Sequence, residues 1–354
     1  MTELSNIGVT MSGPHDPSNH PLYRALRRFW HPVAYSTELG DTPLGVTLLG
    51  ENLVLARLNG TVTALDRRCP HKGTSLALGQ IVDDTIECPY HGWRFDQEGK
   101  CVRVPAREEL CDVLKASVAK YQTAEHVGII WVALEEPMYA LPEFPEFVDT
   151  EYNVLQGNSY DWATSSPRRL ENFVDFAHFS FVHDGTIGSR SNPRVEPVDV
   201  WREGPVLRFN RSGVKEPGVG LKKELLGISD ALIEPVNEYH VTMPHTVHLK
   251  RTFPNGKRYV LFMSASPVTA TQTRSFWWIA RDFGTESKHD AFFRDFEDEV
   301  LGQDKPIIES QRPLWFNLAS GDRAQRETPM RGADVVTVEY RRWLVELMNA
   351  KAKS

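Results

Sequence analysis

The chain has 354 residues, of which 41% are hydrophobic and 25% are charged, and its formal net charge is −7. This length is enough for two domains, and the composition is that of an ordinary globular protein. A negative net charge without any basic run argues against binding to nucleic acid or to anionic membranes, and no apolar stretch has the length of a membrane span. We therefore expect small molecules and other proteins as partners.

The first residues lack the order of a signal peptide, in which a positive charge precedes an apolar segment. We predict a lead-in over residues 1–28 and a cytoplasmic location. From residue 29 to residue 138, apolar and polar residues alternate in short runs that Gly, Asn and Pro interrupt, which predicts an all-β domain. One of these runs ends at Asn59-Gly60, the strongest short signal for a tight hairpin turn.

Two short pairs of metal-binding side chains stand inside this β domain, namely Cys69 with His71 and Cys88 with His91. Such a set can close a tetrahedral zinc site, or it can hold a [2Fe-2S] cluster with thiolates on one iron and histidines on the other. Zinc sites of this composition usually pair Cys with Cys and His with His, whereas both pairs are mixed here. Mixed pairs suit two loops that each give one ligand to each iron. The spacing therefore predicts a Rieske cluster, with zinc as the alternative.

A stretch rich in proline and glutamate follows at residues 135–150 and marks a domain boundary, so we place a second domain at residues 139–354. It mixes helical segments with runs that are typical of strands, which predicts an α+β fold. The candidate strands are residues 206–209, 239–243, 259–263 and 275–279, and the run from Val338 to Leu347 has helical spacing.

The segment from residue 171 to residue 183 places two histidines and two carboxylates among apolar residues on a predicted helix. Asp175 and His178 would share one helix face, whereas His178 and His183 can converge on one ion only if the helix bends or ends between them. One carboxylate from elsewhere would complete the 2-His-1-carboxylate triad of non-haem Fe(II) oxygenases. Asp304 is our candidate. The alternative for His178 and His183 is that they are buried core residues, and the alternative for Asp304 is that it caps a helix.

With both motifs, the chain resembles the oxygenase (alpha) component of the Rieske non-haem iron oxygenases. The second motif has the form N-x-x-D-x-x-H-x₄-H, from Asn172 to His183, and shorter similarities lie at residues 29–32, 92–93 and 303–313. Within the family the chain most resembles the branch of vanillate, dicamba and methylxanthine demethylases, in which the stretch from Asp304 to Gln311 recurs. That stretch strengthens Asp304 as an iron ligand.

The resemblance implies an antiparallel sheet wrapped around a long helix, of the helix-grip type, with the substrate pocket between the sheet and the metal-binding helix. It implies that Asp175 bridges the iron ligand His178 and the cluster ligand His91 of a neighbouring subunit, so that the enzyme is an oligomer, usually a trimer. Asn172 matches a position close to the iron and would tune it. The alternative for Asn172 is a polar residue that is bonded within its helix.

The activity that the resemblance implies is oxidation of a small aromatic or heterocyclic substrate by O₂, with N- or O-demethylation ahead of ring or carbon hydroxylation. No complete G-x-G-x-x-G fingerprint is present, so NAD(P)H should act through a separate reductase, which can include a ferredoxin domain. A Rieske ferredoxin would not need the roughly 200 residues beyond the first domain. A zinc-stabilised binding protein would leave His178, His183 and Asp304 without a role.

Several further side chains have no chemistry that the sequence assigns. Cys101 and Cys111 are expected to be small core residues. Five residues of the candidate strands and their flanks could face the pocket, but sheet core is the expectation for each, and three histidines nearby could bind substrate or lie on the surface. The five are Met243, His245, Phe262, Trp277 and Trp278, and the histidines are His240, His245 and His248.

Overall fold

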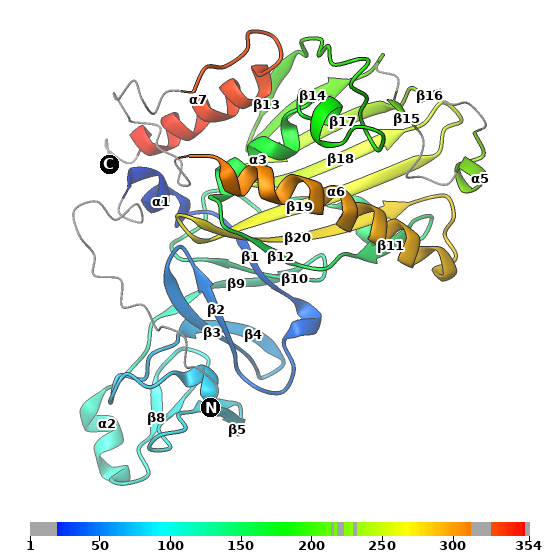
Figure 1. Ribbon diagram of the computed structural model, residues 1–354. Coiled ribbons are helices and arrows are strands. Elements are labelled where there is room, and N and C mark those ends of the chain that lie inside the picture. Colours follow the sequence, from blue (N-terminus) through cyan, green and yellow to red (C-terminus); the bar gives the residue numbers. More distant parts are fainter. Residues whose placement is uncertain (1–19, 214–215, 218–222, 229–231, 313–326, 351–354) are drawn as a thin grey trace, which may run out of the picture.

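The computed structural model describes residues 20–213, 216–217, 223–228, 232–312 and 327–350. Its N-terminal part contains two antiparallel sheets (Figure 1). The larger has the strand order β1-β10-β9-β4-β3-β2, and the smaller has the order β5-β6-β7-β8. The strands are β1 (His31–Tyr35), β2 (Leu44–Leu48), β3 (Glu51–Leu58), β4 (Thr61–Asp66), β5 (Gln80–Val82), β6 (Thr85–Glu87), β7 (Arg94–Phe95), β8 (Cys101–Arg103), β9 (Lys120–His126) and β10 (Ile129–Ala133).

The hairpin between β3 and β4 confirms the turn that the sequence predicts. Asn59 and Gly60 are its two central residues, with φ of 50° and 73°, and Leu58 pairs directly with Thr61. Positive φ at both positions defines a turn whose twist matches that of the flanking strands, and asparagine and glycine tolerate it best.

The C-terminal part is built on one large antiparallel sheet with the strand order β11-β20-β19-β18-β17-β14-β13, and β12 also pairs with β20. All four predicted strands are confirmed within it. The strands are β11 (Asn153–Gln156), β12 (Tyr160–Trp162), β13 (Val200–Glu203), β14 (Val206–Arg211), β17 (Val236–Thr242), β18 (Thr246–Thr252), β19 (Arg258–Thr269) and β20 (Gln272–Arg281), and β15 (Glu216–Pro217) pairs with β16 (Leu232–Ile233) in a separate two-stranded sheet.

Helices cover one face of this sheet, and the longest, α6, runs across the strands (Figure 1). Together with the β-rich N-terminal part, this arrangement confirms the α+β class with a sheet around a long helix. The helices are α1 (Pro21–Leu26), α2 (Cys111–Leu114), α3 (Ser166–Val174), α4 (Phe179–Val182), α5 (Lys223–Leu226), α6 (Asp290–Ser310) and α7 (Val335–Ala350), and α7 contains the helical run predicted at 338–347. Among the described residues, no helix combines the length and the apolar character that a bilayer crossing requires.

Residues 1–19 of the predicted lead-in lie outside the described residues, as does Pro313 of the predicted 303–313 similarity. The rest of the lead-in forms α1, whose Leu22 and Leu26 are buried in the same core as Tyr340 and Leu344 of α7. This part of the segment therefore packs on the C-terminal part of the chain.

The sheet is a shared wall, because side chains alternate between its two faces along each strand. On β19 and β20, one set of residues joins the core under α6, and the alternate set joins a core with Tyr35 and Trp131 of the N-terminal part. Tyr35 also donates a hydrogen bond to the carbonyl of Trp277 across this boundary, at 3.1 Å. The first set includes Tyr259, Met263, Trp277 and Ile279, and the second includes Val260, Phe262, Phe276 and Trp278.

We predict that Trp131→Ala lowers the free energy of unfolding by about 3 to 5 kcal/mol, because loss of this large side chain would leave a cavity between the N-terminal and C-terminal parts of the chain. Trp131 is fully buried, and its indole N–H donates to the carbonyl of His126. Denaturant unfolding checks the value. Trp201→Ala is the control because Trp201 is 44% exposed, and an equal loss in both variants would contradict the packing role of Trp131.

Candidate metal centres and substrate pocket

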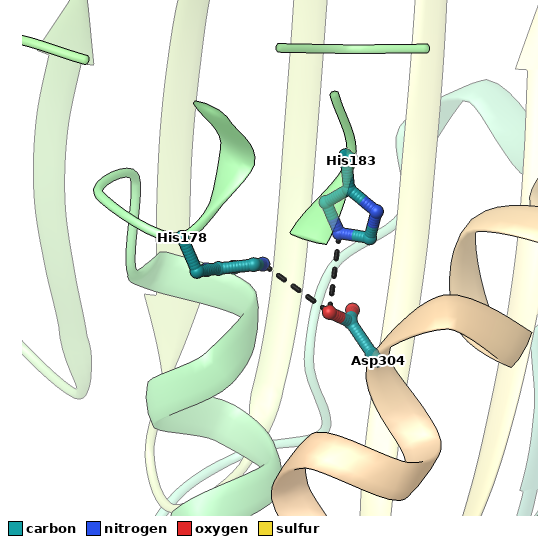
Figure 2. A group of neighbouring side chains, drawn as sticks. All are labelled: His178, His183 and Asp304. Atoms are coloured by element: carbon teal, nitrogen blue, oxygen red, sulfur yellow. Dashed lines mark ion pairs between the residues drawn. The ribbon is translucent and has the colours of Figure 1, made fainter. Parts of the chain in front are cut away.

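Three side chains from two distant parts of the chain meet beneath the sheet. The ligand atoms of His178, His183 and Asp304 all lie within 4.8 Å of one another. One carboxylate oxygen of Asp304 is 3.3 Å from Nε2 of His178 and 3.1 Å from Nε2 of His183, as Figure 2 shows. The structure thus brings together the three residues that we predict as iron ligands.

The local backbone differs from the single helix that the sequence predicts. Helix α3 ends at Val174, and Asp175 has an extended backbone at its C-terminus. His178 directly precedes the short helix α4, and His183 directly follows it. The expectation that Asp175 and His178 share one helix face is therefore wrong, because the helix ends before both. The short helix α4 ends between the two histidines, and their ring centroids are 5.1 Å apart.

Asp304 lies inside α6 and is 6% exposed, so the helix-cap alternative is wrong for this residue. One oxygen of its carboxylate has no hydrogen-bond partner among the described residues, and neither ring nitrogen of His178 has one. Buried polar atoms without partners are costly. An ion between the three side chains would bind the Asp304 oxygen and Nε2 of His178, while Nδ1 of His178 faces Asp175. Two imidazoles with one carboxylate are the donor set of non-haem Fe(II) sites. The residues therefore fit a mononuclear iron.

Neighbouring groups orient the three triad side chains and shift the pKa values of His178 and Asp304. Nδ1 of His183 is 2.7 Å from the side-chain oxygen of Gln303, a contact in which Nδ1–H donates and leaves Nε2 free to bind a metal. Burial disfavours the charged form of His178, but the carboxylates of Asp175 and Asp304 outweigh it and raise the pKa of His178 to about 9. Burial likewise opposes ionisation of Asp304, yet the two imidazoles hold the pKa of Asp304 well below its ordinary value.

The four predicted cluster ligands lie on two similar loops. In the first loop the N–H of Gly73 donates to the carbonyl of Cys69, and in the second the N–H of Gly92 donates to the carbonyl of Cys88. Both glycines have positive φ, 76° and 71°, which allows these sharp turns. The thiols are buried, His91 is exposed and His71 is partly buried.

The ring centroids of His71 and His91 are 4.4 Å apart, and the His71 ring stacks on Trp93 at 4.7 Å. Burial, followed by the neighbouring Cys88, raises the pKa of the Cys69 thiol to about 11. Cys69 must therefore lose its proton when it binds a metal. Two buried sulfurs together with two neighbouring imidazoles, one partly buried and one exposed, fit a [2Fe-2S] cluster with mixed ligands.

The remaining predicted site residues lie near the triad. The amide oxygen of Asn172 accepts a hydrogen bond from Arg169 at 2.9 Å, and Asn172 lines the pocket described next. Asp175 is partly exposed, and one of its carboxylate oxygens is 3.6 Å from Nδ1 of His178. Asp175 can therefore contact His178 on one side and solvent or another subunit on the other.

A pocket lies between the triad and the sheet. It is lined by apolar and polar side chains, namely Arg169, Asn172, Phe173, His178, Phe179, His183, Ile187, Arg211, Asn237, Tyr239, Leu249, Arg251, Leu261, Phe296, Glu297, Val300, Leu301 and Asp304. None of the five strand residues considered for this pocket lines it. Met243 and Trp277 lie in the core under the helices, Phe262 and Trp278 lie on the other face of the sheet, and His245 is buried beside Tyr340.

The sequence reasoning missed the polar residues of the pocket wall, among them Arg211, Asn237 and Arg251. The available signal was strand alternation, because Arg251 follows Val247 and Leu249 at a spacing of two residues and so faces the same side of the sheet. His240 and His248 line a separate hollow on the opposite face. Cys101 is buried beside the cluster loops, as expected of a core residue, and Cys111 is partly buried.

We predict that His183→Ala removes the mononuclear iron and leaves the cluster, because the two centres share no ligand. Iron and acid-labile sulfide analysis would then give about two irons and two sulfides per chain in place of about three and two. His289→Ala, at a partly buried histidine of a short 3-10 helix remote from the triad, is the control. Retention of all three irons in His183→Ala would contradict its role as a ligand.

We also predict that Fe(II) binding to the iron-depleted protein releases about one proton at pH 7, because His178 is protonated before the metal binds and must lose its proton to become a ligand. The pKa of His178 is raised from 6.5 to about 9, so its charged form stabilises the metal-free fold below pH 6.5 and this contribution is lost as the pH rises through 9. Apparent iron affinity should accordingly rise with pH up to about 9. Anaerobic calorimetry in two buffers with different ionisation enthalpies measures the proton, and a binding heat independent of the buffer would contradict it.

Comparisons with known proteins agree with this geometry. The Rieske [2Fe-2S] domain family matches residues 29–122, and the vanillate O-demethylase oxygenase C-terminal domain family matches residues 162–350. The methylxanthine N3-demethylase NdmB of Pseudomonas putida is 34% identical over 336 residues, which cover 91% of this chain and 89% of that protein. The methylxanthine N1-demethylase NdmA of the same organism is 33% identical over 336 residues, covering 92% and 90%.

Solved structures give the same result. The structure of Pseudomonas putida NdmA with caffeine matches with a TM-score of 0.84 and 32% identity, over 95% of this chain and 94% of that one. Dicamba monooxygenase bound to dicamba matches with a TM-score of 0.77 at 22% identity, over 93% and 99%, which shows a shared fold. The chain therefore belongs to the Rieske non-haem iron oxygenases, as an oxygenase component that joins a Rieske [2Fe-2S] domain to a C-terminal domain of the vanillate O-demethylase type.

Proposed function

We propose that this protein is the cytoplasmic terminal oxygenase of a Rieske monooxygenase and demethylates a small aromatic or heterocyclic substrate at nitrogen or oxygen. The observation that carries the proposal is the triad of His178, His183 and Asp304 at the wall of a pocket, in which His183 and Asp304 are buried and His178 is partly buried. The same chain also has two paired Cys/His loops. NdmB and NdmA, which are 34% and 33% identical to this chain over about nine-tenths of its length, are both named N-demethylases.

The proposed ligands divide the chemistry between two centres. Cys69, His71, Cys88 and His91 hold the [2Fe-2S] cluster, and the triad holds ferrous iron. When bound, the two groups supply one-electron transfer and reduction of O₂, respectively. The protein has three tasks beyond this, which are to orient the ligands, to keep water from the pocket and to connect the centres.

Ligand orientation falls to residues behind the triad. Gln303 accepts from Nδ1–H of His183 and so presents Nε2 to the ion. Arg169 donates a hydrogen bond to the amide oxygen of Asn172, and its Nε donates another to the hydroxyl oxygen of Tyr160 at 2.8 Å. We assign Asn172 as a tuning residue beside the iron. The apolar lining, with Phe173, Phe179, Ile187, Leu249 and Leu261, excludes water from the space where the methyl group lies.

Connection of the centres falls to Asp175. Its carboxylate approaches Nδ1 of His178, and its own exposure leaves one side open to a neighbouring subunit. We assign it as the bridge between His178 and the partner subunit's His91, in a homotrimer or a multiple of it. The solvent-facing position of His91 supports this route. A separate reductase, which can include a ferredoxin domain, delivers the electrons from NAD(P)H.

The reaction balances as follows. One oxygen atom of O₂ enters a C–H bond of the methyl group, and the other leaves as water with two electrons and two protons. The N–CH₂OH or O–CH₂OH product then breaks its bond to the heteroatom and gives formaldehyde and the demethylated compound. Hydroxylation of a ring or another carbon would give an alcohol or phenol without formaldehyde, which separates the two reactions.

Metal analysis and turnover test the proposed function directly. Protein purified without oxygen should hold about three irons and two sulfides per chain and show a red-brown Rieske spectrum. With a reductase and NAD(P)H, methylated aromatic compounds should give formaldehyde in proportion to the O₂ consumed. Zinc without sulfide would overturn the oxygenase assignment, and product without formaldehyde would overturn demethylation.

We predict that Asp175→Asn lowers turnover by about 10- to 100-fold while both metal centres remain, because the bridge loses its charge. Iron, sulfide and the absorption spectrum check the centres, and the rate of cluster re-oxidation with bound substrate and O₂ checks the bridge. Asp184→Asn is the control, since Asp184 pairs with Arg190 at 3.3 Å and touches neither centre. Unchanged re-oxidation in Asp175→Asn would remove the bridging role.

A further inference from the structure

A buried arginine of α3 binds the side-chain amide of Asn172. Arg169 is 1% exposed and Asn172 is 5% exposed, and the two residues are three positions apart, so they lie on the same face of the helix. Nη1 of Arg169 donates a hydrogen bond to Oδ1 of Asn172 at 2.9 Å. Both side chains line the pocket that contains the triad. The contact therefore joins a buried cation to an amide in the same pocket as the candidate iron site.

The guanidinium of Arg169 is held from several sides. Its Nε donates a second hydrogen bond to the hydroxyl oxygen of Tyr160, at 2.8 Å. Its central carbon lies 4.7 Å from the ring centroid of Trp162, 5.5 Å from that of Phe173 and 5.6 Å from that of Tyr160. A planar fork with two hydrogen bonds and three aromatic neighbours has little freedom to move.

The chemistry of arginine decides which end of the amide it meets. A guanidinium has N–H donors and no acceptor, so the atom of Asn172 that faces Arg169 must be the oxygen. The amide nitrogen then points the other way. Among the described residues this nitrogen has no hydrogen-bond partner, yet it is not one of the side-chain atoms that the protein encloses without a partner. Since Asn172 lines the pocket, its N–H₂ group opens on that space.

The orientation of this amide matters for a metal at the triad. A carbonyl-type oxygen is a metal ligand, whereas an amide N–H₂ group donates hydrogen bonds. Two imidazoles and one carboxylate leave coordination positions of Fe(II) open. An amide oxygen turned into the pocket would compete for one of these positions, and an amide N–H₂ group does not.

We propose that Arg169 is a positioning residue, which holds the oxygen of Asn172 away from the iron site and presents the amide N–H₂ group to the pocket. Asn172 is then a hydrogen-bond donor beside the triad and not a fourth protein ligand. The inference rests on the proposed function, because it requires iron at the triad. Arg169 acts on the iron site only through Asn172.

Nitric oxide tests this inference without turnover. It binds to an open position of ferrous iron, and it is added without oxygen to the holoenzyme with its cluster oxidised. The oxidised cluster is diamagnetic, so the electron paramagnetic resonance signal of the nitrosyl reports the mononuclear iron alone. We expect Arg169→Met to bind nitric oxide about 10-fold more weakly than the wild type, because the freed amide turns its oxygen to the metal.

Removal of the amide separates positioning from general damage to the site. The double variant Arg169→Met with Asn172→Ala has no amide oxygen, so its nitric oxide affinity should return to within about twofold of the wild type. Asn172→Ala alone should also stay within about twofold, since its oxygen is not a ligand in the wild type. Arg169→Lys keeps the charge and one donor group and should weaken binding less than Arg169→Met does.

Arg168→Met is the matched control. Arg168 is the preceding residue of α3 and is also buried, at 5% exposure, but it pairs with Glu327 instead of Asn172. This variant should bind nitric oxide as the wild type does. Circular dichroism and iron analysis report whether each variant is folded and holds its metal.

Unchanged affinity in Arg169→Met, or a loss that Asn172→Ala does not restore, would overturn the positioning role. So would tighter binding in Asn172→Ala alone, which would make the amide a ligand of the wild type. If Arg169→Met does not fold, Arg169→Lys takes its place under the same criteria. A wild type without any nitrosyl signal would refute the proposed function together with this inference, whereas a wild-type signal with the wrong order among the variants would refute the role of Arg169 and keep the proposed function.

Discussion

The position of one buried carboxylate governs the architecture of the catalytic domain. Asp304 lies inside a long helix and meets two imidazoles that precede it by more than a hundred residues. A buried carboxylate is costly without positive partners, so helix α6 and the segment around α4 must stay in one relative position. Phe293 and Ile308 anchor α6 by burial, and Glu297 adds its hydrogen bond to Tyr259 of the sheet.

The large sheet connects the catalytic domain to the N-terminal part because each of its two faces packs into a different hydrophobic core. The residues of β19 and β20 alternate between the catalytic core and the core that is shared with the N-terminal sheet. The small sheet that adjoins the cluster loops, β5 to β8, lies at the far end of the molecule from α6 (Figure 1). Such a separation within one chain supports the proposed electron route through a neighbouring subunit.

The pocket combines two chemical characters on one sheet face. Toward the middle of the strands, Tyr239, Leu249 and Leu261 provide an apolar surface, whereas Arg211, Asn237 and Arg251 form a polar row at one end. Cross-strand register places these three residues side by side although about forty residues of sequence separate the first from the last. The same register that builds the sheet therefore sets the polarity of the pocket wall.

The sequence by itself determined the family and the chemistry of the centres, because metal ligands require particular residue types at short spacings. The pairs Cys69/His71 and Cys88/His91, and the two histidines of the second motif, are local patterns of this kind. Strand alternation and the hairpin at Asn59-Gly60 likewise depend on near neighbours. Asp304 is an intermediate case, since the facial triad called for a distant carboxylate and the family resemblance selected this one.

Tertiary structure decided the end of α3 before Asp175, the burial of Asp304 within a helix and the residues of the pocket wall. Met243, Phe262, Trp277 and Trp278 all lie in cores, while the arginines that were not considered face the pocket. Strand register and helix packing bring residues together across long stretches of chain, and their energies depend on contacts that no local pattern contains.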